Sequence, residues 1–235
     1  MTPAIAAVLF DKDGTLFDFG RTWNAWSLRA LRELSQGDAQ VMAAMAEAAR
    51  FDLVAGRFLP DSPIIAGTNR EAAECFARGL PGADVAAIES YLAQGAAEAP
   101  LAEAVPLDPF LRGLAAQGLR LGVMTNDTEF SARAQLGRAG VLERFEFVAG
   151  FDSGFGAKPA PDPLLAFAAH VGLRPDQVLM VGDSRHDLIA GRAAGMATAG
   201  VLTGMAQAAD LAPLADVVLP DIGHLPGWLG MTLPV

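Results

Sequence analysis

The chain has 235 residues, 52% hydrophobic and 19% charged, a composition typical of a globular protein with a substantial core. Its formal net charge of -10 disfavours a general nucleic-acid or anionic-membrane surface but leaves open a small anionic ligand. A single cysteine, Cys75, excludes an internal disulfide. Because the first apolar run is too short for a signal peptide, we expect a cytoplasmic protein without a membrane span.

Six apolar runs predict the strands of one parallel sheet, because strands covered on both faces are continuously apolar. They cover residues 4–10, 119–125, 145–148, 177–181, 198–202 and 216–219. Helical patterns lie between them at 108–117, 130–139, 163–171 and 188–194, each ending near a glycine, with Asp162 as an expected N-cap. The alternation predicts an α/β fold, a Rossmann-like parallel sheet with helices on both faces.

One region interrupts this alternation. Residues 21–99 show helical spacing at 26–34, 39–50, 71–77 and 85–97, with no convincing strand. The Gly- and Pro-rich stretch 56–70 is expected to be a loop, and Trp23 and Trp26 to belong to the seam of a helix bundle. We therefore expect a catalytic core formed by 1–18 and 100–235, with an all-helical cap at 19–99.

Two carboxylates follow the first predicted strand. Asp11 and Asp13 lie on the same side of an extended backbone, so both can face one site. Like charges this close need a compensating cation or a shared proton, and a hard divalent cation bound through oxygen meets that need. Gly14 and Thr15 allow a tight turn whose N–H groups can meet an anion.

Polar side chains also follow other strands. Thr125 and Asn126 come after the second strand, Lys158 lies in a later loop, and Asp183 follows the fourth strand with Asp187 four residues on. The carboxyl ends of parallel strands share one edge of a sheet, so these groups should converge. Carboxylates suit Mg²⁺, whereas lysine and threonine suit phosphoryl oxygens, so the sequence predicts a magnesium site beside a phosphate site.

Four segments, FDKDGTL, MTND, GAKPAPD and VGDSRHD, stand in this order, each after a predicted strand or in a loop. Together they resemble the four motifs of the haloacid dehalogenase superfamily, over about two thirds of the chain. The similarity is to the phosphoglycolate phosphatase-like branch, whose helical C1-type cap is inserted after the first motif. The helical insert at 19–99 occupies the corresponding place.

The resemblance implies a reaction. Asp11 would attack phosphorus and form an aspartyl-phosphate. Asp13 would protonate the leaving oxygen and then deprotonate the water that cleaves the intermediate. An acid at this position favours transfer from an oxygen ester, because a halide leaves without a proton.

The resemblance also implies ligands for a metal and a phosphate. Mg²⁺ would be held by Asp183, the Asp11 carboxylate and the Asp13 backbone carbonyl. Asp187 would influence the metal without binding it directly. The phosphoryl oxygens would be held by residues of the first three motifs, namely Gly14, Thr125, Asn126 and Lys158.

Two positions depart from the family's usual pattern. Lys12 stands where an apolar residue is more usual, and by alternation it should point away from Asp11 and not touch the substrate. Asp127 adds a negative charge next to the phosphate site and weakens the fit unless it points outward. Neither change removes a catalytic group.

The cap should set specificity, because it closes over the site and meets the leaving group. Phe17, Asp18 and Arg21 lie at the cap entry, and Arg57 and Arg70 flank the Gly- and Pro-rich loop, so these five are the candidate substrate contacts. The three histidines are scattered and do not form a metal set, although His186 lies between two motif aspartates.

Three functions remain open. The first is a Mg²⁺-dependent phosphatase for a small phosphorylated metabolite such as phosphoglycolate, acting as a monomer or homodimer without a nucleic-acid or membrane partner. The second is a beta-phosphoglucomutase-like phosphomutase, which would yield an isomer and not free phosphate. The third is a non-catalytic binding protein, which would be marked by a lost nucleophile or metal ligand, and none is lost here.

Overall fold

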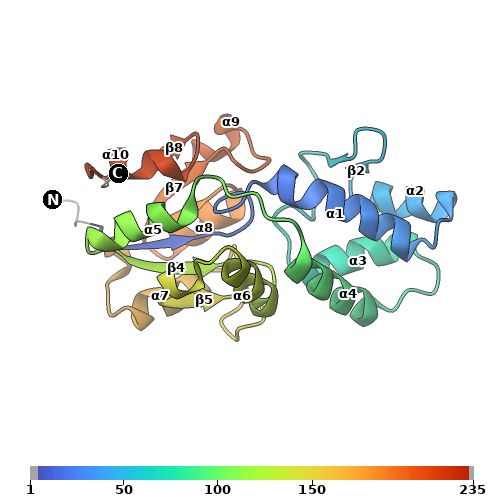
Figure 1. Cartoon of the computed structure of the whole chain (residues 1–235), viewed down its shortest axis with the longest axis horizontal. Coiled ribbons are helices and arrows are strands. Elements are labelled where there is room, and N and C mark those ends of the chain that lie inside the picture. The colour runs from blue at the N-terminus through green and yellow to red at the C-terminus, as the bar shows by residue number, and fades with distance from the viewer. Residues whose placement is uncertain (1–4, 233–235) are drawn as a thin grey trace.

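The computed structural model describes residues 5–232, which fold into two lobes (Figure 1). One lobe contains a six-stranded parallel sheet in the order β5-β4-β1-β6-β7-β8. The strands are β1 (Ala7–Phe10), β4 (Arg120–Met124), β5 (Phe147–Ala149), β6 (Val178–Gly182), β7 (Ala197–Val201) and β8 (Val217–Leu219). Each overlaps a predicted strand, so the predicted parallel sheet is confirmed; residue 4 of the first prediction lies outside the described residues.

Helices cover both faces of the sheet. Val8 and Phe10 of β1 pack in one cluster with α5 (Leu107–Ala116) and α6 (Glu129–Arg138). Ala7 and Leu9 point the other way, into a cluster with α7 (Asp162–His170) and α8 (Arg185–Ala193). This alternation along one fully buried strand explains why its sequence is apolar throughout. The predicted Rossmann-like α/β fold is therefore confirmed.

Each of these core helices ends just before the glycine that was predicted to end it. Gly118, Gly140, Gly172 and Gly195 all have positive φ, between 68° and 85°, as expected for residues that end a helix. The expected cap of α7 is wrong, because Asp162 is the first helical residue and Pro161 stands at the cap position without a side-chain hydrogen bond. The fixed φ of Pro161 suits the start of a helix, although proline offers no side-chain acceptor for the first amides.

The second lobe consists of α1 (Phe19–Leu34), α2 (Ala39–Ala48), α3 (Asn69–Gly79) and α4 (Val85–Glu98), which share a hydrophobic cluster of their own. Polar residues cap all four helices, and α3 has a complete capping box between Thr68 and Glu71. The expectation of no strand in this region is wrong. A short hairpin pairs β2 (Phe51–Asp52) with β3 (Arg57–Phe58).

This hairpin lies partly inside the stretch predicted as a loop. The Asp52 carboxylate accepts hydrogen bonds from the Val54 and Ala55 amides and thereby forms the turn. The Phe51 and Phe58 rings meet edge to face at 5.0 Å between centroids. Strands of two residues are too short to show an alternating pattern, so sequence periodicity could not predict them.

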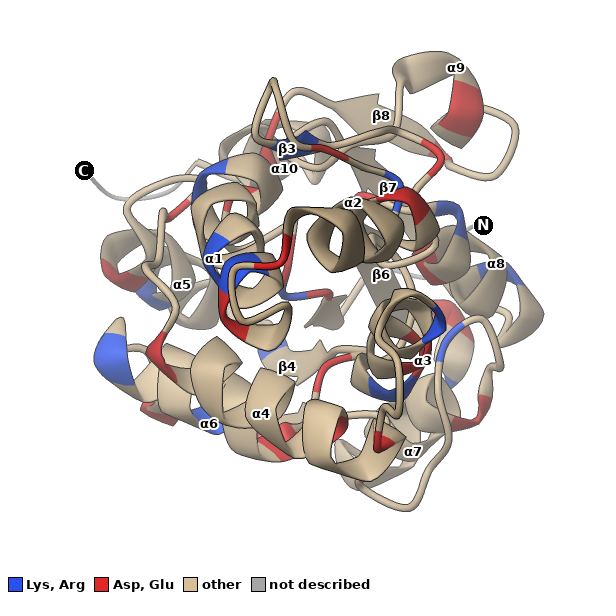
Figure 2. Ribbon diagram, turned by 90° about the vertical axis from the view of Figure 1, so that its right-hand side faces the viewer, with Lys and Arg blue, Asp and Glu red and all other residues tan. Residues whose placement is uncertain are grey.

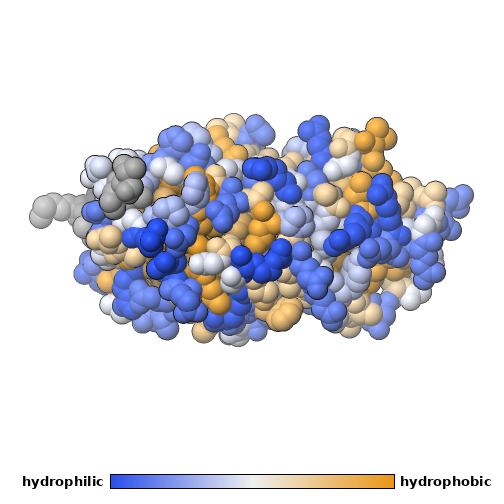
Figure 3. All heavy atoms as spheres, viewed as in Figure 1, coloured by the Kyte–Doolittle hydropathy of each residue, from blue (hydrophilic) through white to orange (hydrophobic). Residues whose placement is uncertain are grey.

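The remaining elements are short. They are the 3₁₀ turns at Leu142–Arg144, Pro175–Gln177 and Ile222–His224, and helices α9 (Ala208–Leu211) and α10 (Leu225–Trp228). Across the described part of the chain, no helix combines the length and the apolar character needed to cross a bilayer. On the face in Figure 3, hydrophilic side chains cover much of both lobes, with hydrophobic atoms showing between them.

The two lobes are joined through α4 and α6. Three side chains of α6 donate hydrogen bonds to carbonyls in the C-terminal half of α4 and just beyond it: Ser131 Oγ at 2.9 Å, Gln135 Nε2 at 2.7 Å and Arg138 Nη1 at 2.8 and 3.0 Å. The acceptors are the carbonyls of Ala93, Ala96, Ala97 and Ala99. The last carbonyls of a helix can lack a partner within it, and Arg138 of the core supplies one to the Ala97 carbonyl in the last turn of α4.

Candidate active site

The site lies where the strand order of the sheet reverses. Asp11, Thr125 and Asp183 directly follow β1, β4 and β6, three neighbouring strands whose carboxyl ends meet at one edge. A cavity opens above this edge, lined by these residues and by side chains of the second lobe. The predicted convergence of the strand ends is therefore present in the fold.

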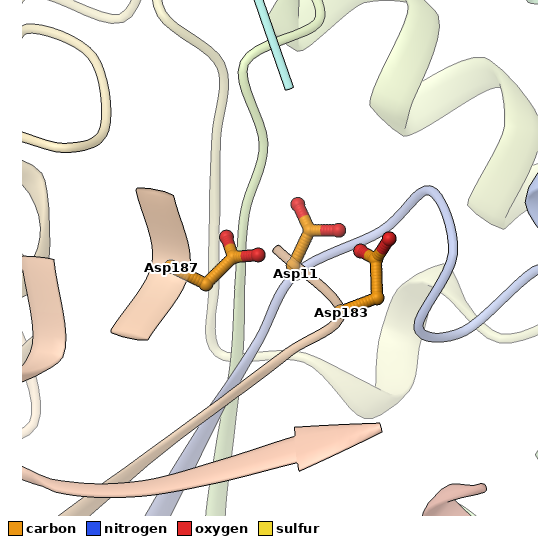
Figure 4. A group of neighbouring side chains, drawn as sticks. All are labelled: Asp11, Asp183 and Asp187. Atoms are coloured by element: carbon orange, nitrogen blue, oxygen red, sulfur yellow. The ribbon is translucent and has the colours of Figure 1, made fainter. Parts of the chain in front are cut away.

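Three buried carboxylates form the floor of the cavity. Asp11, Asp183 and Asp187 each offer an oxygen, and these atoms all lie within 4.8 Å of one another (Figure 4). Asp187 is held from its own helix, because its Oδ2 accepts hydrogen bonds from the Ser184 amide at 3.0 Å and the Ser184 hydroxyl at 2.6 Å. Its carboxylate is thus less free than the other two.

Lys158 joins this group from the loop after β5. Its Nζ donates to Asp11 Oδ1 and Asp187 Oδ1, each at 2.6 Å, and to the Met124 carbonyl at 2.8 Å. The ammonium is fully buried, which lowers the lysine pKa, but the two carboxylates outweigh burial and raise it. Lys158 is therefore a fixed positive charge beside Asp11.

The charges on the floor do not balance within the protein. Burial raises the pKa of Asp11 to about 7, against the opposing effect of Lys158. Burial, with Asp11 and Asp187 nearby, also raises the pKa of Asp183 well above its usual range. Three carboxylates around one ammonium leave negative charge uncompensated, and a divalent cation bound through oxygen fits this donor set.

Two glycines let the backbone approach Asp183. A Cβ on Gly14 would lie 2.4 Å from Asp183 Cγ, and one on Gly204 would lie 1.6 Å from Asp183 Oδ2. The Gly14 amide, expected to face phosphate, donates instead to the Phe17 carbonyl at 2.7 Å. Close approach to the carboxylate, rather than a free N–H, is what requires glycine at position 14.

Asp13 is held by two donors outside the carboxylate group. The indole Nε1 of Trp23, on cap helix α1, donates to Asp13 Oδ1 at 2.8 Å. The Lys12 ammonium lies 2.6 Å from Asp13 Oδ2. Asp13 faces the cavity together with Asp11, as alternation along the backbone predicted.

Lys12 and Asp127, the two departures from the family pattern, contact each other. Lys12 is completely buried and does not line the cavity, as predicted, and its Nζ lies 3.3 Å from Asp127 Oδ2. The same ammonium donates to Gln135 Oε1, while Gln135 Nε2 donates to the Ala96 carbonyl of the cap. Asp127 does line the cavity, but Lys12 offsets its charge.

Burial raises the pKa of Asp127, although Lys12 opposes that shift. Burial also lowers the pKa of Lys12, but the carboxylates of Asp13 and Asp127 outweigh it and leave that pKa raised. Lys12 is therefore a buried cation shared by two carboxylates, and a chain of contacts runs from Asp13 through Lys12 and Gln135 to the cap helix α4.

Asn126 ties the core to the cap loop. Its Nδ2 donates to the carbonyls of Ala66 at 3.0 Å and Lys158 at 2.9 Å, and its Oδ1 accepts from the Lys158 amide at 3.0 Å. Its own carbonyl accepts from the Asn69 amide at 3.2 Å. The neighbouring Thr125 is buried, lines the cavity, and its Oγ1 accepts from the Asp127 amide at 3.1 Å.

The five cap-side candidates do not line the cavity of the described structure. Phe17 is buried in the sheet lobe, and the Asp18 side chain caps α1 by accepting from the Arg21 amide. Arg21, Arg57 and Arg70 are exposed, and Arg70 pairs with two glutamates of the cap. Sequence position near the cap entry did not tell which way these side chains would point.

Other residues line the cavity without having been predicted as site residues. Trp23 and Trp26, expected in the bundle seam, belong both to the cap's hydrophobic cluster and to the cavity wall. His186 also lines the cavity, as its place between two motif aspartates hinted. Gly204, which lies next to Asp183, could have been predicted from the sequence as a residue of the site. It comes shortly after β7, and the carboxyl ends of parallel strands share this edge of the sheet.

Two of the curated proteins that this chain resembles are phosphoglycolate phosphatases. The chain is 40% identical over 126 residues to a phosphoglycolate phosphatase of Rhodospirillum rubrum, covering 53% of this chain and 52% of that protein. It is 38% identical over 123 residues to a phosphoglycolate phosphatase of Escherichia coli K12, covering 52% of this chain and 48% of that protein. The match thus spans about half the length of these curated relatives.

Solved structures share the fold over nearly the whole chain. CbbY from Rhodobacter sphaeroides, solved in complex with phosphate, superposes with a TM-score of 0.71 at 21% identity, covering 94% of this chain and 96% of that one. A HAD phosphatase from Thermococcus onnurineus gives 0.61 at 22%, covering 98% and 100%. The family model for haloacid dehalogenase-like hydrolases matches residues 5–195, most of the chain. The chain belongs to the haloacid dehalogenase-like hydrolase family.

Proposed function

We propose that the protein is a Mg²⁺-dependent phosphatase that hydrolyses a small phosphate monoester through an aspartyl-phosphate on Asp11. The observation that carries this proposal is the buried group of Asp11, Asp183 and Asp187 around Lys158, with Asp13 facing the same cavity. The names of the relatives, phosphoglycolate phosphatases, support the same reaction class. The proposed core is 1–18 with 100–235, and the proposed cap is 19–99.

The metal would be held by the Asp11 and Asp183 carboxylates and the Asp13 backbone carbonyl, with Asp187 reaching it indirectly, since Ser184 and Lys158 already occupy its oxygens. When bound, Mg²⁺ supplies positive charge for the phosphoryl oxygens. The Thr125 hydroxyl, the backbone N–H of Asn126 and the Lys158 ammonium would hold the remaining phosphoryl oxygens.

Asp11 and Lys158 act as a pair in the first step. The Asp11 carboxylate attacks phosphorus, and a new bond from the carboxylate oxygen to phosphorus replaces the bond to the leaving oxygen. Lys158 now contacts Asp11 at 2.6 Å, so its ammonium lies where charge develops on the phosphoryl group. Its raised pKa keeps it charged throughout.

Asp13 moves the protons in both steps. In its protonated form it gives a proton to the leaving oxygen, and as a carboxylate it takes one from the water that attacks the aspartyl-phosphate. Trp23 and Lys12 orient this carboxyl group toward the cavity. The second step restores the free Asp11 carboxylate and releases phosphate, so atoms and protons balance over the cycle.

A phosphomutase would use the same first step but would transfer the phosphoryl group back to a sugar. The mostly apolar cap wall offers few partners for sugar hydroxyls, so the wall favours hydrolysis of a different ester. Small phosphorylated molecules are the proposed partners. The cytoplasmic location and the monomeric or homodimeric state stay predictions.

The test is phosphate release from a panel of small phosphate esters, with Mg²⁺ and with chelator, using the native chain, Asp11→Asn and Asp176→Asn. Asp176 is an exposed carboxylate outside the cavity, so it is the matched control. We expect Mg²⁺-dependent release that falls about 10⁴-fold or more in Asp11→Asn and is unchanged in Asp176→Asn. If the native chain instead converted a sugar phosphate to its isomer and released no free phosphate, the protein would be a phosphomutase and this proposal would be wrong.

A further inference from the structure

The part of the cavity that would receive the leaving group is walled by the cap. With phosphorus next to Asp11, the rest of an ester extends away from the carboxylate floor, toward side chains of the second lobe. Aromatic rings dominate this wall. Those that line the cavity are Phe19, Trp23, Trp26, Phe58 and Phe76.

Four of these five rings form two packed pairs. Trp23 and Trp26 meet edge to face with centroids 5.4 Å apart, and Phe19 and Phe58 meet in the same way at 5.8 Å. Ile64 and Ile65, from the loop before α3, extend the apolar surface. Rings packed in this way keep a fixed apolar shape at low entropic cost to a bound ligand.

Among the described residues, the cap places no lysine, arginine or histidine side chain on the cavity wall. Helices α2 and α4 contain no lysine or arginine at all (Figure 2). The arginines of the cap's loop region point elsewhere: Arg57 is exposed, and Arg70 pairs with Glu74 and Glu89. A second negative charge on the ester would meet no cation on this side.

Three polar side chains on the cap wall already have hydrogen-bond partners. The Trp23 indole donates to Asp13, the Thr68 hydroxyl bonds within its capping box, and Asn69 Nδ2 donates to the Glu89 carbonyl at 3.0 Å. A polyol such as a sugar would therefore lose hydrogen bonds to water on binding and regain few of them.

We infer that the leaving group is an uncharged, largely apolar alcohol, such as an aryl-substituted or branched alkyl alcohol, and not a hydroxy acid or a sugar. This inference rests on the proposed function and narrows its substrate class. Glycolate carries a carboxylate, and burying that charge against aromatic rings without a counter-ion is strongly unfavourable. An apolar alcohol gains affinity from the same surface.

The first experiment compares three esters whose leaving oxygens are all primary alkyl oxygens, so that intrinsic reactivity differs little. They are 2-phenylethyl phosphate, 2-phosphoglycolate and glucose 6-phosphate, each assayed with the native chain and Mg²⁺. We expect kcat/KM for 2-phenylethyl phosphate to exceed the other two values by about tenfold or more. Equal or higher kcat/KM for 2-phosphoglycolate would overturn the inference and leave the phosphatase proposal standing.

A charge placed on the wall supplies the second experiment. Ile65→Lys adds an ammonium to the cavity lining, while Val54→Lys adds the same charge at a residue that is 99% exposed and outside the cavity. We expect Ile65→Lys to shift the ratio of kcat/KM values toward 2-phosphoglycolate by about tenfold. Val54→Lys should leave the ratio unchanged. An equal ratio of kcat/KM values in both variants would contradict the assignment of this wall as the surface that contacts the leaving group.

Binding separates this inference from the proposed reaction. Asp11→Asn retains the cap wall, and calorimetry on this variant with Mg²⁺ measures affinity for each ester without turnover. Tighter binding of 2-phenylethyl phosphate than of 2-phosphoglycolate supports the inference even if the native chain hydrolyses neither, in which case only the phosphatase proposal fails. Equal or weaker binding of 2-phenylethyl phosphate overturns the inference.

Discussion

Lys12 and Asp127 carry opposite charges at the two positions where this sequence departs from the motif pattern it resembles. From the sequence, Lys12 was expected to point away from Asp11 and not to touch the substrate, and Asp127 to weaken the fit unless it points outward. In the structure the two residues are paired, and Lys12 also holds Asp13 at 2.6 Å. Because the ammonium is wholly buried, each carboxylate depends on it for compensation.

Replacing Lys12 with methionine should therefore damage both stability and turnover. Lys12→Met keeps most of the unbranched side chain but leaves Asp13 and Asp127 without their cation, so we expect the free energy of unfolding to fall by about 3 kcal/mol. Because the Asp13 carboxyl loses its orientation, kcat should fall about tenfold or more with a smaller change in KM. Urea unfolding and steady-state kinetics measure both effects.

The double variant Lys12→Met/Asp127→Asn is the control for this prediction. Removing the second charge should recover part of the lost stability, because the two side chains interact directly. It should not recover kcat, since Asp13 still lacks its partner. If Lys12→Met alone were as stable and as active as the native chain, Lys12 would have no such role.

Asp11 gives a prediction about pH in the metal-free protein. Burial raises its pKa from 3.8 to about 7, so between these values the folded chain binds more protons than the unfolded chain. Its contribution to the free energy of unfolding is fully present below the lower value and is lost as pH rises through about 7. Asp11→Asn cannot titrate and removes this contribution.

We expect the native chain in chelator to lose stability relative to Asp11→Asn as pH rises from about 4 to about 7, the interval between the two pKa values of Asp11. Saturating Mg²⁺ should reduce this loss, because the cation favours the ionised carboxylate. Urea unfolding at several pH values measures the difference. A difference that stays constant with pH would mean that Asp11 is not perturbed in the folded state.

At the scale of the elements, the six strands were predictable because parallel strands covered by helices are continuous apolar runs, and a polar motif directly follows three of them, β1, β4 and β6. Helix α1 begins at Phe19, well before the predicted start at 26, because the Asp18 side chain caps it. The β2–β3 hairpin could not be predicted, since it consists of two residues in each strand and depends on the contact of Phe51 with Phe58.

The loop after β7 gives a prediction at this scale. Gly204→Ala would place a Cβ 1.6 Å from Asp183 Oδ2, so the carboxylate must move. We expect weaker Mg²⁺ binding and a loss of about 10²-fold in kcat, the effect of misplacing a catalytic group by about 1 Å. Gly137→Ala is the control, because a Cβ there meets nothing within 4 Å. Unchanged Mg²⁺ affinity in Gly204→Ala would refute this role for Gly204.

At the scale of the whole molecule, the convergence of the motifs was predictable from the parallel sheet, but the wall of the cavity was not. Trp23 of the cap donates to Asp13 of the core, across the boundary between the lobes. Arg57 is exposed to solvent, although it flanks the Gly- and Pro-rich loop that was expected to border the site. Both facts depend on how the cap rests on the core. That placement comes from long-range contacts, which periodicity and motif spacing do not encode.

The contact of α6 with the end of α4 should stabilise the molecule as a whole. Arg138→Met removes two hydrogen bonds to the carbonyls of Ala97 and Ala99, and we expect it to cost about 1 kcal/mol in the free energy of unfolding. Arg174→Met is the control, because the hydrogen bonds of the Arg174 side chain reach only Asp176, two residues away. Equal unfolding midpoints for the two variants would argue against this role of α6.

The most direct test of the account is to look for the phosphoryl group on Asp11. The native chain with Mg²⁺ and a hydrolysed ester would be quenched in acid during the first turnover, digested and analysed by mass spectrometry. The account predicts one added phosphoryl group on the peptide that contains Asp11, and none in Asp11→Asn. Phosphate release by the native chain, with no phosphoryl group on this peptide at any quench time, would contradict it.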